Sequence, residues 1–343
     1  MGSVKDLEIL ESPKGLNPGR GRFHFSDRYS VFDWGEMPDH IPSKGASLCL
    51  TSAYFFELLE GRGIKTHYIG LVEGGKVKRL DELRSPSSVM EVELLRVIRP
   101  EVREGKYNYG VFKDQEGNFL IPLEIIYRNS LPPGTSVFRR LKEGSLSPQD
   151  LGFDSVPGPG TRLPQPFFDL STKLEETDRY ISWEEAAEMA GLKAEELDRI
   201  REIVSEVNEL ITDEVSKLGL QNEDGKIELG FDGERRFMVV DAVGTLDECR
   251  FSWQGTSVSK ELARIYYRST PWYGEVEEAK RRDRVHWREM VKADPPPLPP
   301  RFKELLSLLY RCFAQELTGR EWFGPLPPLR SVLEEIKGLL PQA

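Results

Sequence analysis

Cysteine and histidine are scarce in this sequence. Among 343 residues there are three cysteines and four histidines, and no two cysteines have CxxC spacing. These residues are Cys49, Cys249, Cys312, His24, His40, His67 and His286. An odd number of scattered cysteines argues against a disulfide framework, and the lack of paired ligand spacing argues against a zinc site. We therefore expect the histidines to be structural rather than metal ligands.

The chain also lacks long apolar runs and any excess of basic residues. No stretch approaches the length of a membrane span, and no signal peptide is visible. Acidic residues outnumber basic ones by 57 to 47, and the isoelectric point is about 5.2. This balance argues against nucleic acid or a membrane surface as a general partner, but it permits a local basic pocket for a phosphorylated small molecule. We expect a cytoplasmic protein of about two domains.

Apolar periodicity and turn residues predict helices mixed with antiparallel strands. The expected elements are strands at 65–71, 89–98 and 120–127, a charged hairpin connection at 99–118, and helices at 43–61, 194–218, 259–267, 275–288, 301–317 and 332–340. Ser182 and Glu185 have the spacing of a capping box and predict a further helix start. Strands outnumber helices in the first part of the chain, which favours an α+β fold over a doubly wound sheet.

The most informative stretch carries the dipeptide Asp232-Gly233 between two strand-like runs. Asp-Gly in this setting is a strong hairpin signal. Side chains alternate faces along a strand, so a connection of two residues and one of four residues give the same pairing parity. In either case Lys226, Glu228 and Asp241 share one face of the hairpin, whereas a three-residue connection would separate them.

Two interpretations fit a pair of carboxylates and a lysine on one sheet face. One is a solvated outer face with a weak ion pair. The other is a magnesium site, because Mg²⁺ takes one or two carboxylates and completes its octahedron with water and nucleotide phosphates. Asp241 favours the second, since it ends an apolar run where an unpaired charge is unfavourable. Asp247 and Arg250 follow within ten residues. We therefore expect Glu228 and Asp241 to bind Mg²⁺.

Two N-terminal segments have the composition of ligand-binding loops. Gly2, Ser3 and Lys5 stand at the start of a strand-like run, which suits a short phosphate-covering loop or simply an N-terminal edge. Residues 25–45 place charged side chains among aromatics, prolines and glycines. This segment is too polar for a core strand and too aromatic for a flexible linker, so we expect an ordered functional loop.

A series of short motifs follows a specific order over about residues 1–270. They are Gly2-Ser3-Val4-Lys5-Asp6, Ser26-Asp27-Arg28-Tyr29-Ser30-Val31-Phe32-Asp33, Ile41-Pro42-Ser43-Lys44-Gly45, Glu124, Tyr127-Arg128-Asn129, Gly134-Thr135-Ser136, Ser171-Thr172-Lys173, Asp178-Arg179-Tyr180-Ile181-Ser182, Asp224, Lys226-Ile227-Glu228, Asp241, Asp247, Arg250 and Arg264. Each motif is short, but their ordered combination is specific. In this combination the chain resembles the SAICAR synthetases, the phosphoribosylaminoimidazole-succinocarboxamide synthases of purine biosynthesis.

The resemblance implies a two-lobed α+β fold related to the ATP-grasp enzymes. An antiparallel N-terminal lobe would cover residues 1–120, a larger α+β lobe residues 121–290, and a helical C-terminal extension residues 291–343. The implied activity is ATP-dependent amide formation between L-aspartate and the carboxylate of carboxyaminoimidazole ribonucleotide (CAIR), with ATP and Mg²⁺ in the cleft between the lobes. A homo-oligomer is compatible with the family, and we expect the extension to pack on the catalytic body or on a second subunit.

The resemblance also implies a role for each candidate residue, and Glu228 and Asp241 keep their metal role. ATP would be bound by Gly2, Ser3, Lys5 and Glu124. The ribotide phosphate would be held by Arg128, Ser136 and Arg264, with Arg250 nearby. The cleft would be lined by Lys173 and Asp178, and a mobile substrate loop would contain Ser30, Asp33 and Lys44. Asp224 and Lys226 would orient the imidazole and its carboxylate. Asp224, Lys226 and Arg250 would thus form the catalytic group.

The chain departs from the family pattern at four positions. Ser3 stands where the family commonly has lysine, Thr177 where histidine is common, and Ala242 where glutamate is common, while Thr135 resembles an inserted residue. These differences leave three alternatives open. They are a related ATP-dependent amide ligase, a small-molecule kinase, and a nucleotide-binding module without catalysis.

Overall fold

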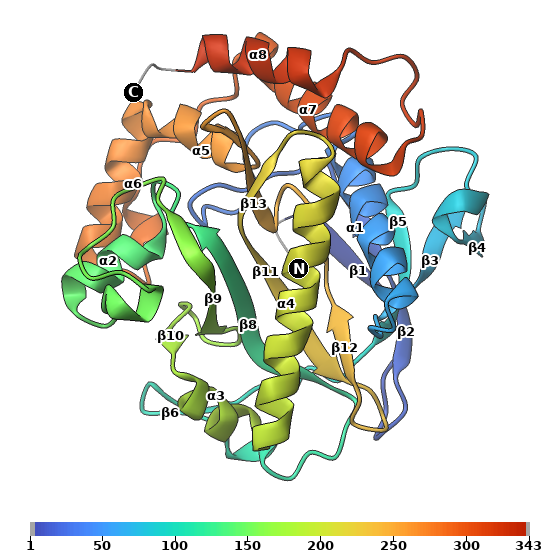
Figure 1. The fold of residues 1–343 in the computed structure, drawn as a ribbon, viewed down its shortest axis with the longest axis vertical. Helices are drawn as coiled ribbons and strands as arrows, with labels where there is room; N and C mark the ends of the chain where they lie inside the picture. The colour runs from blue at the N-terminus through green and yellow to red at the C-terminus, as the bar shows by residue number, and fades with distance from the viewer. Residues whose placement is uncertain (1–3, 341–343) are drawn as a thin grey trace.

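The computed structural model describes residues 4–340, beginning with a five-stranded antiparallel sheet of order β1-β2-β5-β3-β4. Its strands are β1 (Lys5–Glu11), β2 (Gly19–Phe25), β3 (Tyr68–Glu73), β4 (Lys76–Lys78) and β5 (Val89–Leu94). Helix α1 (Lys44–Gly61) packs against this sheet (Figure 1). The helix predicted from residue 43 and the strands predicted near 65–71 and 89–98 are confirmed. Strand β3 starts three residues later than predicted, and β5 ends four residues earlier.

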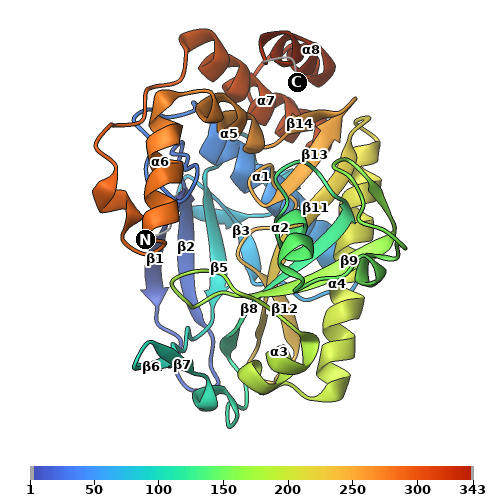
Figure 2. The same ribbon diagram turned by 90° about the vertical axis from the view of Figure 1, so that its left-hand side faces the viewer.

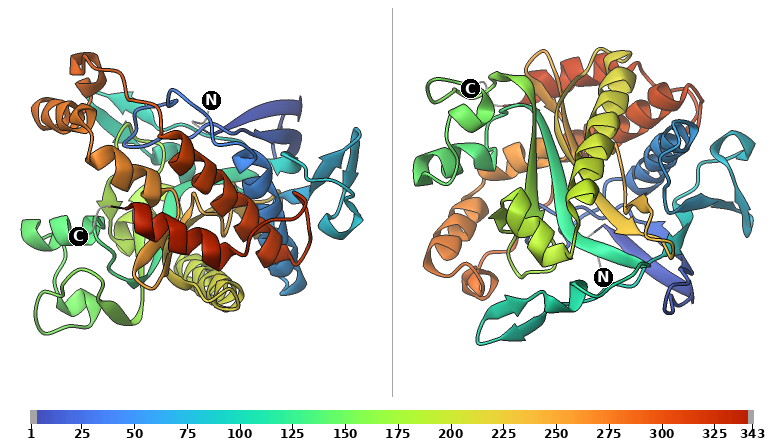
Figure 3. Two further views of the ribbon diagram at one scale, coloured as in Figure 1. Left: turned by 90° about the horizontal axis from the view of Figure 1, so that it is seen from above. Right: turned by 60° about the horizontal axis from the view of Figure 1, so that its bottom comes forward.

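A seven-stranded sheet lies beside the first (Figure 2) and has the order β10-β9-β8-β11-β13-β14, with β12 paired to β11. Its strands are β8 (Phe119–Ser130), β9 (Arg162–Thr172), β10 (Tyr180–Ile181), β11 (Gln221–Phe231), β12 (Phe237–Val240), β13 (Cys249–Trp253) and β14 (Thr256–Val258). All pairs between these named strands are antiparallel, which is typical of the predicted α+β class. Strands β6 (Glu101–Arg103) and β7 (Lys106–Asn108) form the predicted hairpin connection, which projects from the body in the right-hand view of Figure 3.

One face of the larger sheet is covered by the long helix α4 (Ala194–Ser216), which crosses it in Figure 1. The buried contacts are Ile125 and Tyr127 of β8, Ile227 and Leu229 of β11, and Ile200, Val204, Val207 and Ile211 of α4. Helix α3 (Trp183–Ala190) begins as predicted, because the Ser182 hydroxyl accepts a hydrogen bond from the backbone N–H of Glu185 at 3.1 Å. Strand alternation then turns the polar residues of β8 and β11 away from α4.

The remaining helices surround the two sheets. They are α2 (Ser136–Glu143), α5 (Glu261–Arg268), α6 (Pro271–Arg282), α7 (Pro300–Thr318) and α8 (Leu329–Leu339), with 3₁₀ turns η1 (Leu80–Glu82), η2 (Gly110–Phe112), η3 (Gln149–Leu151) and η4 (Trp287–Met290). Helix α7 packs on α1, and α8 lies beside α7 in the left-hand view of Figure 3. Across residues 4–340 no helix has the length and apolarity needed to cross a membrane.

One apolar core connects the three predicted segments of the chain. Phe56, Ile227 and Phe313 belong to the same cluster of buried side chains, although they come from residues 1–120, 121–290 and 291–343 respectively. The C-terminal extension therefore packs on the rest of the chain. The exact domain boundaries at 120 and 290 stay a prediction.

The β11–β12 hairpin has a longer connection than the sequence predicts. Phe231 pairs with Phe237, so residues 232–236 connect the strands, rather than two or four residues. This odd-numbered connection shifts the parity by one. If β12 continued, Asp241 would face the opposite side of the sheet from Glu228. The predicted parity is therefore wrong.

The dipeptide Asp232-Gly233 serves this longer turn in two ways. The Asp232 carboxylate accepts hydrogen bonds from the backbone N–H groups of Glu234 and Arg236, each at 2.9 Å. At Gly233 an added Cβ would lie 2.1 Å from the carbonyl oxygen of Leu16. The aspartate thus organises the turn through its side chain, and the glycine permits a close contact with another loop. The dipeptide does not form a two-residue hairpin turn; Asp232 and Gly233 instead begin a β-turn in which the Arg235 N–H donates to the Asp232 carbonyl at 3.1 Å.

Asp232→Asn is expected to reduce the acid sensitivity of the fold. Burial alone would raise the pKa of Asp232, but hydrogen bonds from Lys65 and Arg236 outweigh burial and lower the pKa to about 2. Because the folded pKa lies below the unfolded one, this carboxylate stabilises the fold above about pH 4, and the contribution is lost as the pH falls toward 2. Between about pH 5 and pH 2, the free energy of unfolding measured by denaturant titration should fall about 2 kcal/mol less in the variant. Identical acid dependence in the two proteins would contradict this assignment.

Candidate active site

The face of the larger sheet turned away from α4 carries a row of charged side chains. Asp224, Lys226 and Glu228 occupy alternate positions of β11. On β8, Arg128 lies opposite Asp224, and Glu124 lies opposite Glu228. The face therefore has an acidic end and an arginine-rich end, with Lys226 between them.

Glu228 and Asp241 line one pocket at the acidic end. The chain leaves β12 at Asp241, whose φ is 70°, so its side chain does not follow the alternation of the strand. The Lys5 ammonium donates a hydrogen bond to Asp241 Oδ1 at 2.6 Å, and the Lys173 ammonium donates to Glu228. The two carboxylates thus lie in the same pocket through a local backbone turn, despite the wrong parity prediction.

The electrostatics of this acid pair favour a bound cation. Burial raises the pKa of Glu228, and the neighbouring Asp241 raises it further. Burial would also raise the pKa of Asp241, but Lys5 and Lys173 outweigh burial and lower it. Within residues 4–340, no group of three or more His, Cys, Asp or Glu side chains is arranged to hold a metal ion. A cation between these two acids would therefore take its other ligands from water or substrate.

A largely apolar pocket of about 330 Å³ contains the acid pair. Its apolar lining consists of Leu7, Ile9, Pro13, Phe23, Leu94, Leu95, Val97, Leu120 and Val240, and His67, Glu93 and Lys173 add polar groups. Leu7, Ile9 and Val97 are 50%, 58% and 55% exposed, which is unusual for apolar side chains grouped around one pocket. Such a slot suits a flat ring joined to a charged group that reaches the carboxylates.

The other end of the sheet face is built around Arg128, which is buried. Its guanidinium donates hydrogen bonds to Asp224 at 3.2 Å, Thr135 at 3.1 Å, Tyr180 at 3.2 Å and Ser136 at 3.3 Å. Its Nε is also buried but has no hydrogen-bond partner in the described part of the chain. A buried guanidinium with an unused N–H group suits a phosphate or carboxylate ligand.

The sequence prediction missed two residues of this cluster. Arg140 of α2 donates a hydrogen bond to Asp169 of β9, which also lies 3.4 Å from Arg128. The Arg140 guanidinium lies 4.3 Å from the centre of the Tyr180 ring. The sequence did offer a signal for Asp169, because this acid stands within the apolar run 167–170. Asp241 stands in a similar position at the end of another apolar run. A buried acid in an apolar run indicates a partner elsewhere in the chain.

Arg250 and Arg264 come from β13 and α5. Arg250 Nε donates to Asp224 Oδ1 at 2.8 Å, so this predicted residue joins the arginine-rich end. Arg264 donates to Glu261 of its own helix at 3.1 Å. Glu261 also pairs with Arg268 at 2.6 Å, so one carboxylate holds two arginines on α5.

Lys226 lies between the two ends and has two carboxylate partners, Glu124 on the neighbouring strand β8 and Glu248 in the turn before β13. Its ammonium donates to Glu124 at 2.6 Å and lies 3.5 Å from Glu248. Burial would lower the pKa of Lys226, but Glu248 and Glu124 outweigh burial and raise it, so the lysine is charged at neutral pH. Asp178 lies in the loop before β10. Burial raises the pKa of Asp178, and the negative charge of Glu124 raises it further.

The predicted substrate loop does not gather its three candidate residues in one place. Lys44 is the first residue of α1 rather than a loop residue, and its fully buried ammonium donates to Asp247 at 2.6 Å. Asp33 is exposed and lies 3.3 Å from Lys280. Ser30 lines a small cavity next to Asp247.

The predicted phosphate loop is described only in part. Gly2 and Ser3 lie outside the described residues. Lys5 begins β1 and reaches the acid pair through its contact with Asp241. Its ammonium also lies 4.7 Å from the centre of the Phe23 ring, which is part of the pocket lining.

Comparisons with known proteins agree along nearly the whole chain. The sequence profile of the family described as SAICAR synthetase matches residues 15–282. A protein of Archaeoglobus fulgidus, provisionally assigned as a phosphoribosylaminoimidazole-succinocarboxamide synthase, is 54% identical over 340 residues and covers 99% of this chain and 100% of its own length. The phosphoribosylaminoimidazole-succinocarboxamide synthase of Thermoplasma acidophilum is 36% identical over 308 residues, covering 88% of this chain and 93% of that protein.

Solved structures share the fold. The SAICAR synthase of Saccharomyces cerevisiae, solved with SAICAR, has a TM-score of 0.65 at 21% identity and covers 94% of this chain and 95% of its own. A SAICAR synthetase in complex with ADP has a TM-score of 0.57 at 23% identity, with coverage of 87% and 99%. At these identities the neighbours show the fold alone. The family profile and the full-length relative establish that this chain belongs to the SAICAR synthetase family.

Proposed function

We propose that the chain catalyses the reaction of its family with the acid pair and the arginine cluster as the two ends of its active site. SAICAR synthetases are ATP-dependent ligases that join L-aspartate to the carboxylate of CAIR, giving SAICAR, ADP and phosphate in purine biosynthesis. The observation that carries the proposal is the arrangement of one sheet face, with Glu228 at one end, buried Arg128 at the other and Lys226 between them. The reaction needs a nucleotide site and a ribotide phosphate site with the reacting carboxylate between them.

The pocket at the acidic end is the proposed ATP site. Its apolar walls, with Leu7 and Ile9 exposed in the protein alone, suit an adenine ring. Lys5 would face the phosphates, and Glu228 and Asp241 would hold Mg²⁺. Their hard oxygen donors fit this ion, and the repulsion that raises the pKa of Glu228 would be relieved by it. Bound Mg²⁺ would neutralise charge on the phosphates during transfer.

The arginine-rich end is the proposed site for the ribotide phosphate. Arg128 offers a buried guanidinium fork whose Nε has no partner among residues 4–340. Ser136 begins helix α2, so its hydroxyl and the helix N-terminus lie beside that fork. Arg250 and Arg264 would complete the charge neutralisation of a phosphate, for which the planar guanidinium is well suited.

The residues between the two ends position the reacting carboxylate of CAIR. The charged Lys226, held by Glu124 and Glu248, would orient this carboxylate toward the ATP γ-phosphate. The γ-phosphoryl group would pass to a carboxylate oxygen, ADP would leave, and the amine of L-aspartate would displace phosphate to form the amide bond. Lys173 and Asp178 would line this part of the site, and Asp224 would fix Arg128 and Arg250.

ADP release is expected to require all three substrates. It should be measured with ATP, CAIR and L-aspartate together, and then with CAIR or L-aspartate omitted in turn. Release that needs both CAIR and L-aspartate supports the proposed ligase. Release with CAIR but without an amine would indicate a kinase, and ATP binding without any turnover would indicate a non-catalytic module.

A further inference from the structure

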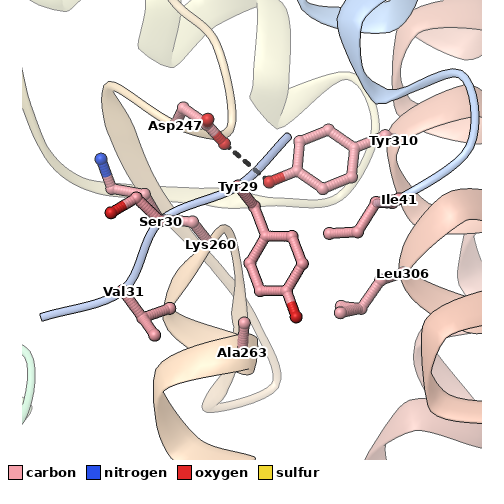
Figure 4. Close-up of a pocket in the computed structure, with 9 residues that line it drawn as sticks. All are labelled: Tyr29, Ser30, Val31, Ile41, Asp247, Lys260, Ala263, Leu306 and Tyr310. Atoms are coloured by element: carbon pink, nitrogen blue, oxygen red, sulfur yellow. Dashed lines mark hydrogen bonds between the residues drawn. The ribbon is translucent and has the colours of Figure 1, made fainter. Parts of the chain in front are cut away.

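Helix α7 reaches a buried carboxylate that borders the active site, although it lies beyond residues 15–282 matched by the family profile. The Tyr310 hydroxyl donates a hydrogen bond to Asp247 Oδ1 at 2.6 Å, as the dashed line in Figure 4 shows. The Lys44 ammonium donates to the other oxygen, Oδ2, also at 2.6 Å. All three side chains are buried. Both oxygens of Asp247 therefore have a donor, one from α1 and one from α7.

This arrangement fixes the direction of the Asp247 carboxylate. Burial would raise the pKa of Asp247, but Lys44 and Lys260 outweigh burial and lower it, so the group is ionised. A buried carboxylate oxygen without a donor is strongly unfavourable, and the side chain would turn toward another donor if Tyr310 lost its hydroxyl. Among the residues that line the cavity next to Asp247, the cationic side chain is Lys260.

Lys260 differs from the other lysines of the site because it has no carboxylate partner. Among the described residues, none forms an ion pair with Lys260 within 4.0 Å. Burial lowers the pKa of Lys260, whereas the paired Lys173 and Lys226 have raised pKa values. The backbone N–H of Lys260 donates to the carbonyl of Leu246 at 3.1 Å, in the turn that also carries Glu248, the partner of Lys226 at 3.5 Å, so Lys260 borders the proposed reaction centre.

We propose that α7 completes the substrate site: Tyr310 positions Asp247 against Lys44, and so leaves the Lys260 ammonium free to bind an anionic group of a substrate. This inference rests on the proposed function. Three substrate groups share the required chemistry: the carboxylates of L-aspartate, the carboxylate of CAIR and the phosphate of CAIR. The carboxylates of L-aspartate are favoured, because the cluster around Arg128 already provides for the phosphate and Lys226 for the CAIR carboxylate. Tyr310 is a positioning residue in this account, and Lys260 contacts the substrate.

Tyr310→Phe is expected to raise the KM for L-aspartate about tenfold, with the KM for ATP within about twofold of the wild-type value. The change keeps the aromatic ring that packs in the core and removes only the hydroxyl. Tyr54→Phe is the matched control, since its hydroxyl donates to Glu214 at 2.9 Å between α1 and α4. Both variants should lower the thermal unfolding temperature slightly, but only Tyr310→Phe should change a substrate KM.

Lys260→Gln tests the same proposal without disturbing the buried hydrogen bonds. It should raise the KM for L-aspartate more than Tyr310→Phe does, and adding Tyr310→Phe to it should have little further effect, since both changes remove one interaction. A rise confined to the KM for CAIR supports the anion site with the phosphate or the carboxylate of CAIR as its ligand. Unchanged KM values for both substrates in Lys260→Gln would overturn the proposal. A wild-type protein that releases no ADP would instead refute the proposed function.

Discussion

Replacing Glu228 with glutamine is expected to lower kcat by about a thousandfold while leaving the fold intact. Glutamine keeps the size of the side chain but removes a negative charge that would hold the cation together with Asp241. Burial and Asp241 disfavour the ionised form of Glu228 more than Lys173 and Lys226 favour it, so the pKa of Glu228 is raised and removing its charge relieves a net repulsion. In the variant, the Lys173 ammonium would still have the Asp241 carboxylate close to it. The thermal unfolding temperature should therefore not fall, and ADP release would report the loss of turnover.

Asp241→Asn should have a similar effect on turnover, and Glu234→Gln is the control. Glu234 lies in the same β11–β12 hairpin, but its side chain is 72% exposed and lies in the turn away from the pocket. The control should retain the wild-type rate. Near-normal rates in both Glu228→Gln and Asp241→Asn would remove the proposed metal site.

Arg128→Ala is expected to raise the KM for CAIR about a hundredfold and to leave the KM for ATP within about twofold. The guanidinium would contact the ribotide phosphate and has no role at the nucleotide end of the sheet face. Removing it also deprives buried Asp224 and Asp169 of a partner, so the thermal unfolding temperature should fall. Arg128→Lys separates the two effects, because lysine keeps the charge but lacks the planar fork.

The control for Arg128 is another arginine with several hydrogen bonds. Arg235 donates to Glu196 at 2.6 Å and to the carbonyl of Gln115 at 2.6 Å, in the turn of the hairpin. Arg235→Lys should lower stability without changing the KM for CAIR. The assignment of the phosphate site would be wrong if both Arg128 variants kept the wild-type KM for CAIR.

Much of the fold could be predicted because some elements carry their own local signals. Helix α4 has an apolar stripe at helical spacing, and α3 begins at a serine whose side chain caps it. The pairing of Glu228 with Asp241 was predicted from strand parity, which is wrong, but a second argument pointed to Asp241 because it ends an apolar run in which an isolated charge is unfavourable. That argument concerns burial alone, so it survives the error in the length of the hairpin connection.

The missed features depend on contacts between distant segments. Strand β9 contains Pro164 and Pro166, which argue against a strand when the sequence is considered alone. Without β9 its Asp169 could not be paired with Arg140 of α2. The buried ion pair of Lys44 was missed because its partner, Asp247, lies 203 residues later in the chain. A local pattern carries no information about such a partner.

The central claim is that Glu228 and Asp241 hold a divalent cation that connects the nucleotide to the protein. Titration calorimetry of ADP, with and without Mg²⁺, tests it most directly on the wild-type protein and on the Glu228→Gln, Asp241→Asn double variant. Mg²⁺ should tighten ADP binding to the wild-type protein by at least about tenfold and should have no such effect on the double variant. The same Mg²⁺ dependence in both proteins would contradict the claim.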